Sequence, residues 1–159
     1  MIDKIDKQIL YILQSNARIS NAEIARQVGL APSAILERMR KLSENGVIKN
    51  YETRIEPKEI GLGLLAFVFV RTTDCLEITE RELAKLPEVL EIHDVAGDDS
   101  YLLKVRTKDP DDLARLLREE LRAIPNVIGT RTTVVLQTIK ETSALAIDIE
   151  EPKKKRKKR

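Results

Sequence analysis

The sequence predicts an α+β protein in which a helical N-terminal domain precedes a domain with the element order β-α-β-β-α-β. Three observations support this prediction. Apolar residues recur at helical spacing up to residue 46, and from Gly61 onward strand signals alternate with helix signals. The third is a repeat, since LPEVL (residues 86–90) and IPNVI (residues 124–128) each mark a passage from helix to strand, as expected of two similar β-α-β halves.

Length and composition narrow the class of protein. A chain of 159 residues with 42% apolar and 34% charged residues is typical of one or two soluble globular domains. It contains no apolar run of membrane-spanning length and no secretory signal, so we expect a cytoplasmic protein with no membrane partner. Cys75 and His93 are the only residues of their types, so we expect no metal site, no cofactor and no catalytic residues.

The formal net charge of +2 hides a strong segregation of charge along the chain. Residues 1–58 carry +3, residues 59–152 carry −8, and the last seven residues, 153–159, carry +7. This distribution suits a chain whose two ends meet phosphate and whose middle does not.

The first predicted helix covers residues 3–15. Asp3 is suited to cap its N-terminus, and Asp6 is favourable near that end of the helix dipole. Apolar residues gather on one face of this helix: Ile2, Ile5, Ile9, Ile12 and Leu13.

The stretch from Ser20 to Gly46 predicts two short amphipathic helices on either side of a glycine turn. Ser20 is a suitable N-cap, and Glu23 stands where it would complete a capping box. Gly29 allows the sharp turn, and Pro32 suits the first position of the second helix. This spacing is that of a helix-turn-helix.

The second helix of this pair carries the predicted DNA-reading surface. Ile35, Met39 and Leu42 form its buried stripe, and Asn45-Gly46 is a suitable stop. The opposite side mixes short residues near the N-terminus with long hydrogen-bond donors, as a major-groove reader requires. We expect base contacts from Ser33, Ala34, Glu37 and Arg38, and phosphate contacts from Arg40, Lys41 and Lys49. The alternative is a small helical bundle whose charged outer face is merely solvated.

The following segment, VIKNYETRIEP (residues 47–57), predicts a short strand or wing that leads to the second domain; an ordinary solvated linker is the alternative. LGLLAFVFVRTT (residues 62–73) then predicts a nearly continuous apolar strand. Residues 79–82 read as a capping box, with Ile78 and Leu83 as a hydrophobic staple, and Pro87 ends that helix.

The remaining elements follow in order. VLEIHDVA and SYLLKVRT are predicted to pair as a hairpin across the turn at residues 97–100. Asp109-Pro110 begins a helix that Pro125 ends, and GTRTTVVLQTI (residues 129–139) is the last predicted strand. An antiparallel sheet with both helices on one face leaves Phe67 and Phe69 on the other, and a homodimer is the simplest way to cover it.

At the level of motifs the chain resembles the Lrp/AsnC, or feast/famine, family of regulators. The resemblance extends from Ile2 to about Thr142, and its marks are DKIDKQIL, EIARQVGLAPSAILERMRKLSENGVIKNY and LPEVLEIHDVAGDDSYLLKV. It implies a winged helix-turn-helix joined to a ferredoxin-like βαββαβ domain that binds an effector and oligomerises. On this basis we expect a DNA-binding domain at 1–50, a linker strand or wing at 51–62, an effector and dimerisation domain at 63–142, and an extension with a disordered basic tail at 143–159.

The resemblance also implies sequence-specific binding of double-stranded DNA by a nucleoid-associated transcriptional regulator, assembled as a homodimer or as a tetramer or octamer. Relatives often bind an amino acid or related metabolite near the turn formed here by Gly97, Asp98, Asp99 and Ser100. Two residues depart from the family pattern. Ala31 replaces the serine cap before the proline, and Ser100 replaces an aspartate that could hold an α-amino group by a charge-assisted bond. Asp98 or Asp99 could substitute for that aspartate, or both could serve only to form the turn.

Two other functions remain open at this point. The tail PKKKRKKR should attract phosphate without reading sequence, which favours an architectural DNA-packing protein that has no effector. Some relatives of the fold decarboxylate tetrapyrroles with the help of histidines. His93, in a strand with alternating residues, is expected to be an ordinary sheet residue, so this enzyme function is the less favoured of the two.

Overall fold

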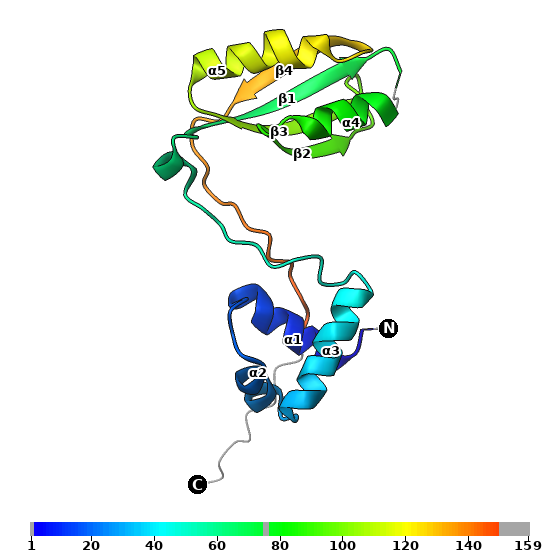
Figure 1. Cartoon of the computed structure of the whole chain (residues 1–159), viewed down its shortest axis with the longest axis vertical. Coiled ribbons are helices and arrows are strands. Elements are labelled where there is room, and N and C mark those ends of the chain that lie inside the picture. The colour runs from blue at the N-terminus through cyan, green and yellow to red at the C-terminus, as the bar shows by residue number, and fades with distance from the viewer. Residues whose placement is uncertain (1, 75–76, 150–159) are drawn as a thin grey trace. The chain divides into compact units, whose positions relative to one another are not determined.

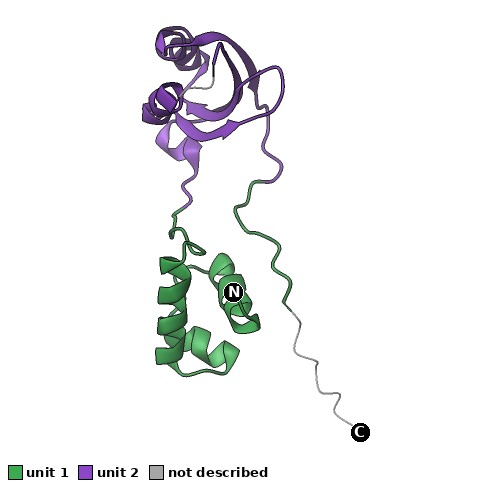
Figure 2. Cartoon of the chain, turned by 90° about the vertical axis from the view of Figure 1, so that its right-hand side faces the viewer, with its two compact units in different colours: residues 1–53, 141–159 green, residues 54–140 purple. Residues whose placement is uncertain are grey.

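The computed structural model describes residues 2–74 and 77–149, so Cys75 and the basic tail Lys153–Arg159 lie outside the described residues. The chain divides into two compact units (Figures 1 and 2). Unit 1 comprises residues 1–53 together with the segment from Glu141, and unit 2 comprises residues 54–140. No helix among the described residues is both long and apolar enough to cross a membrane.

The described part of unit 1 contains three helices: α1 (Lys4–Ser15), α2 (Asn21–Val28) and α3 (Pro32–Glu44). Each helix is too short to be stable alone, and the three hold one another through their apolar faces. Their shared core consists of buried side chains that the helical spacing predicted: Ile9, Leu13, Ile24, Ala25, Ile35 and Leu42. Met39 is only partly buried and packs against this core.

The helix caps in unit 1 agree with the prediction at one helix and differ at another. Asp3 caps α1, and Asp6 returns its carboxylate to the Asp3 backbone, so a complete capping box forms there. Ser20 caps α2 by accepting from the Glu23 backbone. The expected second half of that box is absent, because the Glu23 carboxylate binds Arg26 and Gln27 instead.

The turns around α3 follow from residue chemistry. Gly29 ends α2 with a φ of 74°, and Gly46 follows α3 with a φ of 68°, a left-handed conformation that glycine adopts without a steric penalty. Pro32 occupies the first turn of α3. Ala31 stands at the N-cap and makes no side-chain capping bond, so the backbone donors of the first turn lack this partner.

The substitution Ala31→Ser is expected to stabilise unit 1. The backbone of Ala31 is already extended, as an N-cap requires, so a hydroxyl there can accept from the first turn and add about 1 kcal/mol. Urea unfolding followed by helical circular dichroism measures the gain, with the exposed loop substitution Ala17→Ser as the control. Equal stability of the two variants would show that the missing cap costs nothing.

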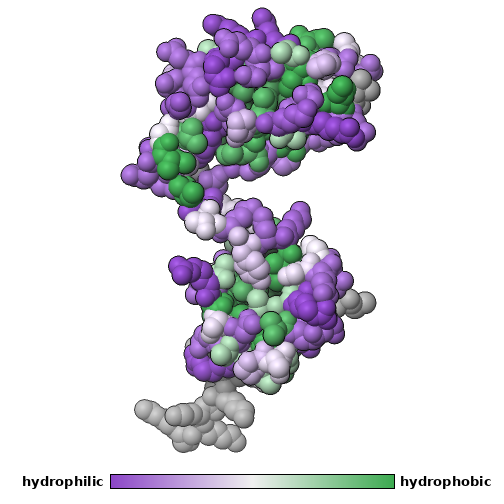
Figure 3. Space-filling model, in the orientation of Figure 1, coloured by the Kyte–Doolittle hydropathy of each residue, from purple (hydrophilic) through white to green (hydrophobic). Residues whose placement is uncertain are grey.

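Residues 47–56 connect the units without regular secondary structure, although the sequence favoured a short strand or wing there. A strand needs a partner to receive its backbone hydrogen bonds, and no described strand pairs with this segment. Figure 3 shows apolar residues at the surface around the next element, the 3-10 helix η1 (Pro57–Ile60), where Ile55 and Ile60 are exposed.

Unit 2 is a four-stranded antiparallel sheet with helices on one face. Its elements are β1 (Leu64–Thr72), α4 (Glu77–Lys85), β2 (Val89–Asp94), β3 (Tyr101–Thr107), α5 (Pro110–Arg115) and β4 (Val127–Val134). A π-helical turn, Leu116–Glu120, and a short 3-10 turn, Leu121–Ala123, continue α5. The strand order β2-β3-β1-β4 confirms the predicted β-α-β-β-α-β arrangement, which is that of the ferredoxin-like fold.

The two faces of this sheet differ in cover. Ala66, Val68 and Val70 are fully buried under the helices, where they pack with Leu83 of α4 and with Leu113 of α5. The alternate residues of β1 lie on the open face. On this face Phe67 and Phe69 are only partly buried. The strand period of two predicted that they would lie opposite the buried residues.

Two details of unit 2 correct the prediction. Thr79 does not cap α4, because that helix already includes Glu77; its buried hydroxyl donates to the Pro125 carbonyl oxygen at 3.2 Å. The proposed staple also fails, since Ile78 is exposed. The last strand runs from Val127 to Val134 rather than to residue 139; one further bond, from the Val135 amide to the Leu65 carbonyl oxygen, follows it, and β1 begins at Leu64, so among the described strands residues 137–139 meet no partner.

Candidate functional site

The first candidate site is the outward face of α3. Burial of Ile35 and Leu42 turns the opposite side of the helix to solvent. Exposed side chains follow one another along that side at helical spacing: Ser33, Glu37, Arg40 and Glu44. Lys41 is also exposed, whereas Ala34 is half-buried at the edge of the face. We call this surface the α3 face.

The α3 face is electrically balanced rather than basic. Arg40 donates to both Glu37 and Glu44, and Lys41 lies 3.3 Å from Glu37. Hydrogen bonds from Arg40 and Lys41 lower the pKa of Glu37 to about 2, so its carboxylate is ionised at neutral pH. Two acids therefore compensate two bases, and phosphate attraction by this face alone is smaller than the composition of the helix suggested.

Arg38 lies away from the α3 face and joins two helices. Its Nη1 donates to Asp3 Oδ2 and Asp6 Oδ1, each at 2.7 Å, and its side chain is only 32% exposed. These bonds raise the pKa of Arg38, while the Asp6 backbone amide and then Arg38 lower the pKa of Asp3. Because Asp3 also caps α1, one ion-pair cluster fixes both the start of α1 and the position of α3. Our expectation that Arg38 reaches base edges is therefore revised.

The structure brings most, though not all, of the predicted DNA-contacting residues together. Ser33, Glu37, Arg40 and Lys41 share one helix, whereas Lys49 lies exposed in the segment that follows. The prediction missed Leu36, which is 59% exposed on α3. It falls outside the buried i, i+4, i+7 stripe, and this was the signal that could have identified it. An exposed aliphatic side chain on such a helix can contact a thymine methyl group.

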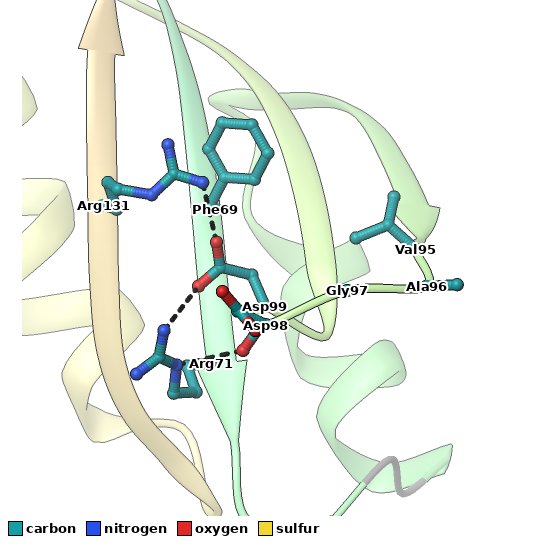
Figure 4. Close-up of a pocket in the computed structure, with 8 residues that line it drawn as sticks. All are labelled: Phe69, Arg71, Val95, Ala96, Gly97, Asp98, Asp99 and Arg131. Atoms are coloured by element: carbon teal, nitrogen blue, oxygen red, sulfur yellow. Dashed lines mark hydrogen bonds and ion pairs between the residues drawn. The ribbon is translucent and has the colours of Figure 1, made fainter.

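The second candidate site is a hollow of about 360 Å³ beside the turn between β2 and β3. Figure 4 shows it between the open face of the sheet and the turn. Its lining comes from β1, β4 and residues 95–99: Phe69, Arg71, Val95, Ala96, Gly97, Asp98, Asp99 and Arg131.

Two arginines hold the turn against the sheet. Arg131 donates to Asp99 at 2.8 Å, and its guanidinium lies 3.9 Å from the centre of the Phe69 ring. Arg71 lies 3.6 Å from the same carboxylate and donates to the Asp98 carbonyl oxygen. With its side chain 10% exposed, Asp99 is committed to these bonds and serves as the anchor of the turn (Figure 4).

The other turn residues differ in availability. Among the described residues, none forms a hydrogen bond or ion pair with the Asp98 carboxylate, and Asp98 and Gly97 both line the hollow. Ser100 does not line it, because its hydroxyl accepts from the Thr72 backbone and hydroxyl at the end of β1. Arg71, Arg131 and Phe69 were missed by the prediction, since only the strand register brings them to the turn.

Potential metal ligands and His93 are the remaining candidates for a site. No cluster of three or more potential metal ligands occurs in the parts of the chain that the structure describes. His93 is exposed on β2, with its Nε2 3.4 Å from Glu91, and it lies outside both candidate sites.

Both units match models of known domain families. Residues 2–49 match a winged helix-turn-helix DNA-binding domain, and residues 65–145 match the Lrp/AsnC ligand binding domain. Together these matches cover most of the chain.

Characterised proteins of similar sequence are transcriptional regulators. The HTH-type transcriptional regulator FL11 of Pyrococcus horikoshii is 41% identical over 147 residues, covering 92% of this chain and 97% of that protein. The leucine-responsive regulatory protein of Escherichia coli is 39% identical over 150 residues, covering 92% of each.

Solved structures agree with the sequence matches. A transcriptional regulator of Neisseria meningitidis in complex with L-methionine superimposes with a TM-score of 0.87 at 30% identity, covering 93% of this chain and 98% of that one. A feast or famine regulatory protein of M. tuberculosis complexed with L-methionine gives a TM-score of 0.86 at 33% identity, covering 93% and 100%.

Proposed function

The chain belongs to the Lrp/AsnC family of transcriptional regulators, and we propose that the α3 face recognises base edges of its operator while the hollow in unit 2 senses an amino acid. The observation that carries the first part is the solvent-open α3 face, which lies opposite the stripe buried in the three-helix core. A major groove admits one helix presented in this way. The second part rests on the hollow beside the β2–β3 turn.

We assign roles to residues of unit 1 from their chemistry. Base edges are approached by Ser33, Ala34 and Glu37. The Glu37 carboxylate suits cytosine, because it can accept a hydrogen bond from the cytosine amino group. Leu36 adds an apolar contact. Phosphates are contacted by Arg40, Lys41 and Lys49. Arg40 and Lys41 interact with Glu37 in the free protein, so DNA binding requires each to replace part of that interaction with a phosphate contact. Arg38 positions α3.

The hollow suits a neutral, zwitterionic amino acid with an apolar side chain. The charges around it balance, because Arg71 and Arg131 face Asp98 and Asp99, so a ligand without net charge fits best. The Asp98 carboxylate is available to accept a charge-assisted hydrogen bond from the α-ammonium group. Asp98 would thereby take the role that an aspartate at residue 100 would have had. Donors of Arg131 or Arg71 that Asp99 leaves free can bind the carboxylate, and Val95 offers apolar contact. The relatives crystallised with L-methionine support this ligand class.

The substitution Asp98→Asn is expected to remove recognition of the ammonium group. The wild type should bind L-methionine at least tenfold more tightly than N-acetyl-L-methionine, because the acetylated form has no positive charge for Asp98 to neutralise. The variant should lose this preference while its melting temperature stays unchanged, since no residue in the described ranges forms a hydrogen bond or ion pair with the Asp98 carboxylate. Isothermal titration calorimetry measures both affinities.

The exposed Asp94→Asn substitution on β2 is the matched control and should keep the preference. An Asp98→Asn variant that still distinguishes the two ligands would contradict the assignment of Asp98.

Self-association is the third part of the proposal. Phe67 and Phe69 lie on the sheet face without helices, and Leu136 and Ile139, in the segment after β4, are 99% and 85% exposed. A single chain leaves these apolar side chains partly or wholly in water, whereas a homodimer or a larger ring of dimers can cover them. We propose that the protein acts in the cytoplasm on nucleoid DNA. We also propose that it has no enzymatic role, because both candidate sites offer groups suited to binding.

An architectural DNA-packing protein is the second candidate function, and the balanced charge of the α3 face together with the basic tail favours it. Footprinting on long genomic DNA separates the two functions. A regulator protects spaced, two-fold symmetric sites, whereas a packing protein covers all sequences uniformly. Uniform coverage at every protein concentration would replace our proposal with this alternative.

A further inference from the structure

The segment that follows β4 packs with the helical unit. Residues 141–149 have no regular secondary structure, yet they group with the helices of unit 1 rather than with the sheet from which the chain emerges (green in Figure 2). Along its last described residues, Ile147 and Ile149 are half-buried while Ala146 and Asp148 are exposed. This alternation is that of an extended segment with one side against a surface.

Gln14 of α1 holds this segment by two hydrogen bonds to a single residue. Its Nε2 donates to the Leu145 carbonyl oxygen at 3.1 Å, and its Oε1 accepts from the Leu145 amide at 2.6 Å. The side chain thus serves as both donor and acceptor, as a neighbouring strand would. A primary amide carries its donor and its acceptor on two adjacent atoms and can therefore bond both backbone groups of one residue, whereas an ionised glutamate offers acceptors alone.

We infer that residues 141–149 form a strap on the helix-turn-helix unit, and that this strap shortens the tether between the unit and the basic sequence Lys153–Arg159, so that these charges meet the bound DNA more often. The need for such charge follows from the α3 face, whose acids compensate its bases. The first of the seven basic residues, Lys153, comes eight residues after Leu145. A fully extended chain of that length spans at most about 29 Å.

The strap shortens the tether of the basic residues. Without it, Lys153 is joined to unit 1 only through the whole of unit 2; with it, the last fixed point is Leu145 on unit 1, eight positions before Lys153. Because effective concentration rises as a tether shortens, docking should raise the concentration of the basic residues at DNA bound by unit 1.

The first arm of the test measures docking without DNA. In the full-length protein, hydrogen exchange at the Leu145 amide should be slowed, and Gln14→Ala should abolish that protection. Gln14→Glu should weaken it, because the carboxylate cannot donate to the Leu145 carbonyl. Gln27→Ala removes an exposed amide side chain from α2 of the same unit and should leave the exchange unchanged. Equal exchange in the wild type and in Gln14→Ala would overturn the strap.

The second arm measures DNA affinity in a double-mutant cycle. At 50 mM salt, Gln14→Ala should weaken DNA binding at least twofold in the full-length chain, and it should have no effect in a chain that ends at residue 152. An equal loss in both chains would overturn the role of the strap in tethering the basic residues. The inference rests on DNA binding by unit 1. A wild-type chain that binds no DNA would refute that function, whereas the exchange measurement would still decide whether the strap exists.

Discussion

Replacement of Lys153–Arg159 by serines is expected to lower DNA affinity at least tenfold at 50 mM salt and to flatten its salt dependence. Each phosphate that a basic residue neutralises contributes about 0.9 to the slope of log K against log salt, so loss of seven residues reduces the slope by up to about 6. The effect should be large because Glu37 and Glu44 offset Arg40 and Lys41 on the α3 face.

The preferred DNA sequence should stay the same in this variant, since contacts to phosphate carry no sequence information. Fluorescence anisotropy over a salt series, with the operator and a random duplex, measures both properties. An unchanged slope would show that the tail does not touch DNA. A changed sequence preference would show that it reads bases.

The substitution Arg38→Ala is expected to weaken operator binding at least tenfold, and to weaken binding to random DNA less, because only the operator depends on correctly placed base contacts. It removes two 2.7 Å bonds between α3 and α1, so the recognition helix loses its fixed orientation and unit 1 loses about 1–2 kcal/mol of stability. Electrophoretic mobility shift on both duplexes, with urea unfolding of the same samples, tests this prediction.

Asp6→Asn is the matched variant, because it weakens the same cluster from a residue of α1 that offers DNA no positive charge. Its effect should resemble that of Arg38→Ala, and the double variant should lose little more. Selective loss of operator binding in Arg38→Ala, with Asp6→Asn unaffected, would return Arg38 to the base-reading residues.

The same cluster sets the direction of a pH effect on stability. The pKa of Asp3 in the folded chain lies below its ordinary value of 3.8, through the Asp6 backbone amide first and Arg38 second. This stabilisation is therefore present above pH about 4 and is lost as pH falls through the lowered pKa. Arg38→Ala should make unfolding less sensitive to pH below that value, as measured by urea unfolding between pH 2 and pH 5.

Local chemistry predicted the fold well. Gly29 and Gly46 adopt the left-handed conformations that their positions suggested, and Ala66, Val68 and Val70 point into the core as the strand period requires. The error at Thr79 arises because its side chain found a distant partner. Thr79 bonds the Pro125 carbonyl, forty-six residues away, instead of capping its own helix.

The candidate sites were predictable only in part for the same reason. Helical spacing identified the α3 face, but Arg38 shares its helix with that face and is held by acids thirty-two and thirty-five residues away. Likewise, the turn at Gly97 could be found from its residues, whereas Arg131 reaches Asp99 only through the pairing of β4 with β1. Contacts of this kind depend on topology, which spacing along the chain does not encode.

The most direct test of the account is selection of duplexes from a random DNA pool by the wild type and by Glu37→Gln. The account predicts that the wild type selects a two-fold symmetric motif and that Glu37→Gln changes the preferred base within each half-site. Glu44→Gln, which removes a partner of the same Arg40 at the far end of the α3 face, should select the wild-type motif. Recovery of no motif by the wild type, or of one motif by all three proteins, would contradict sequence reading by Glu37 on the α3 face.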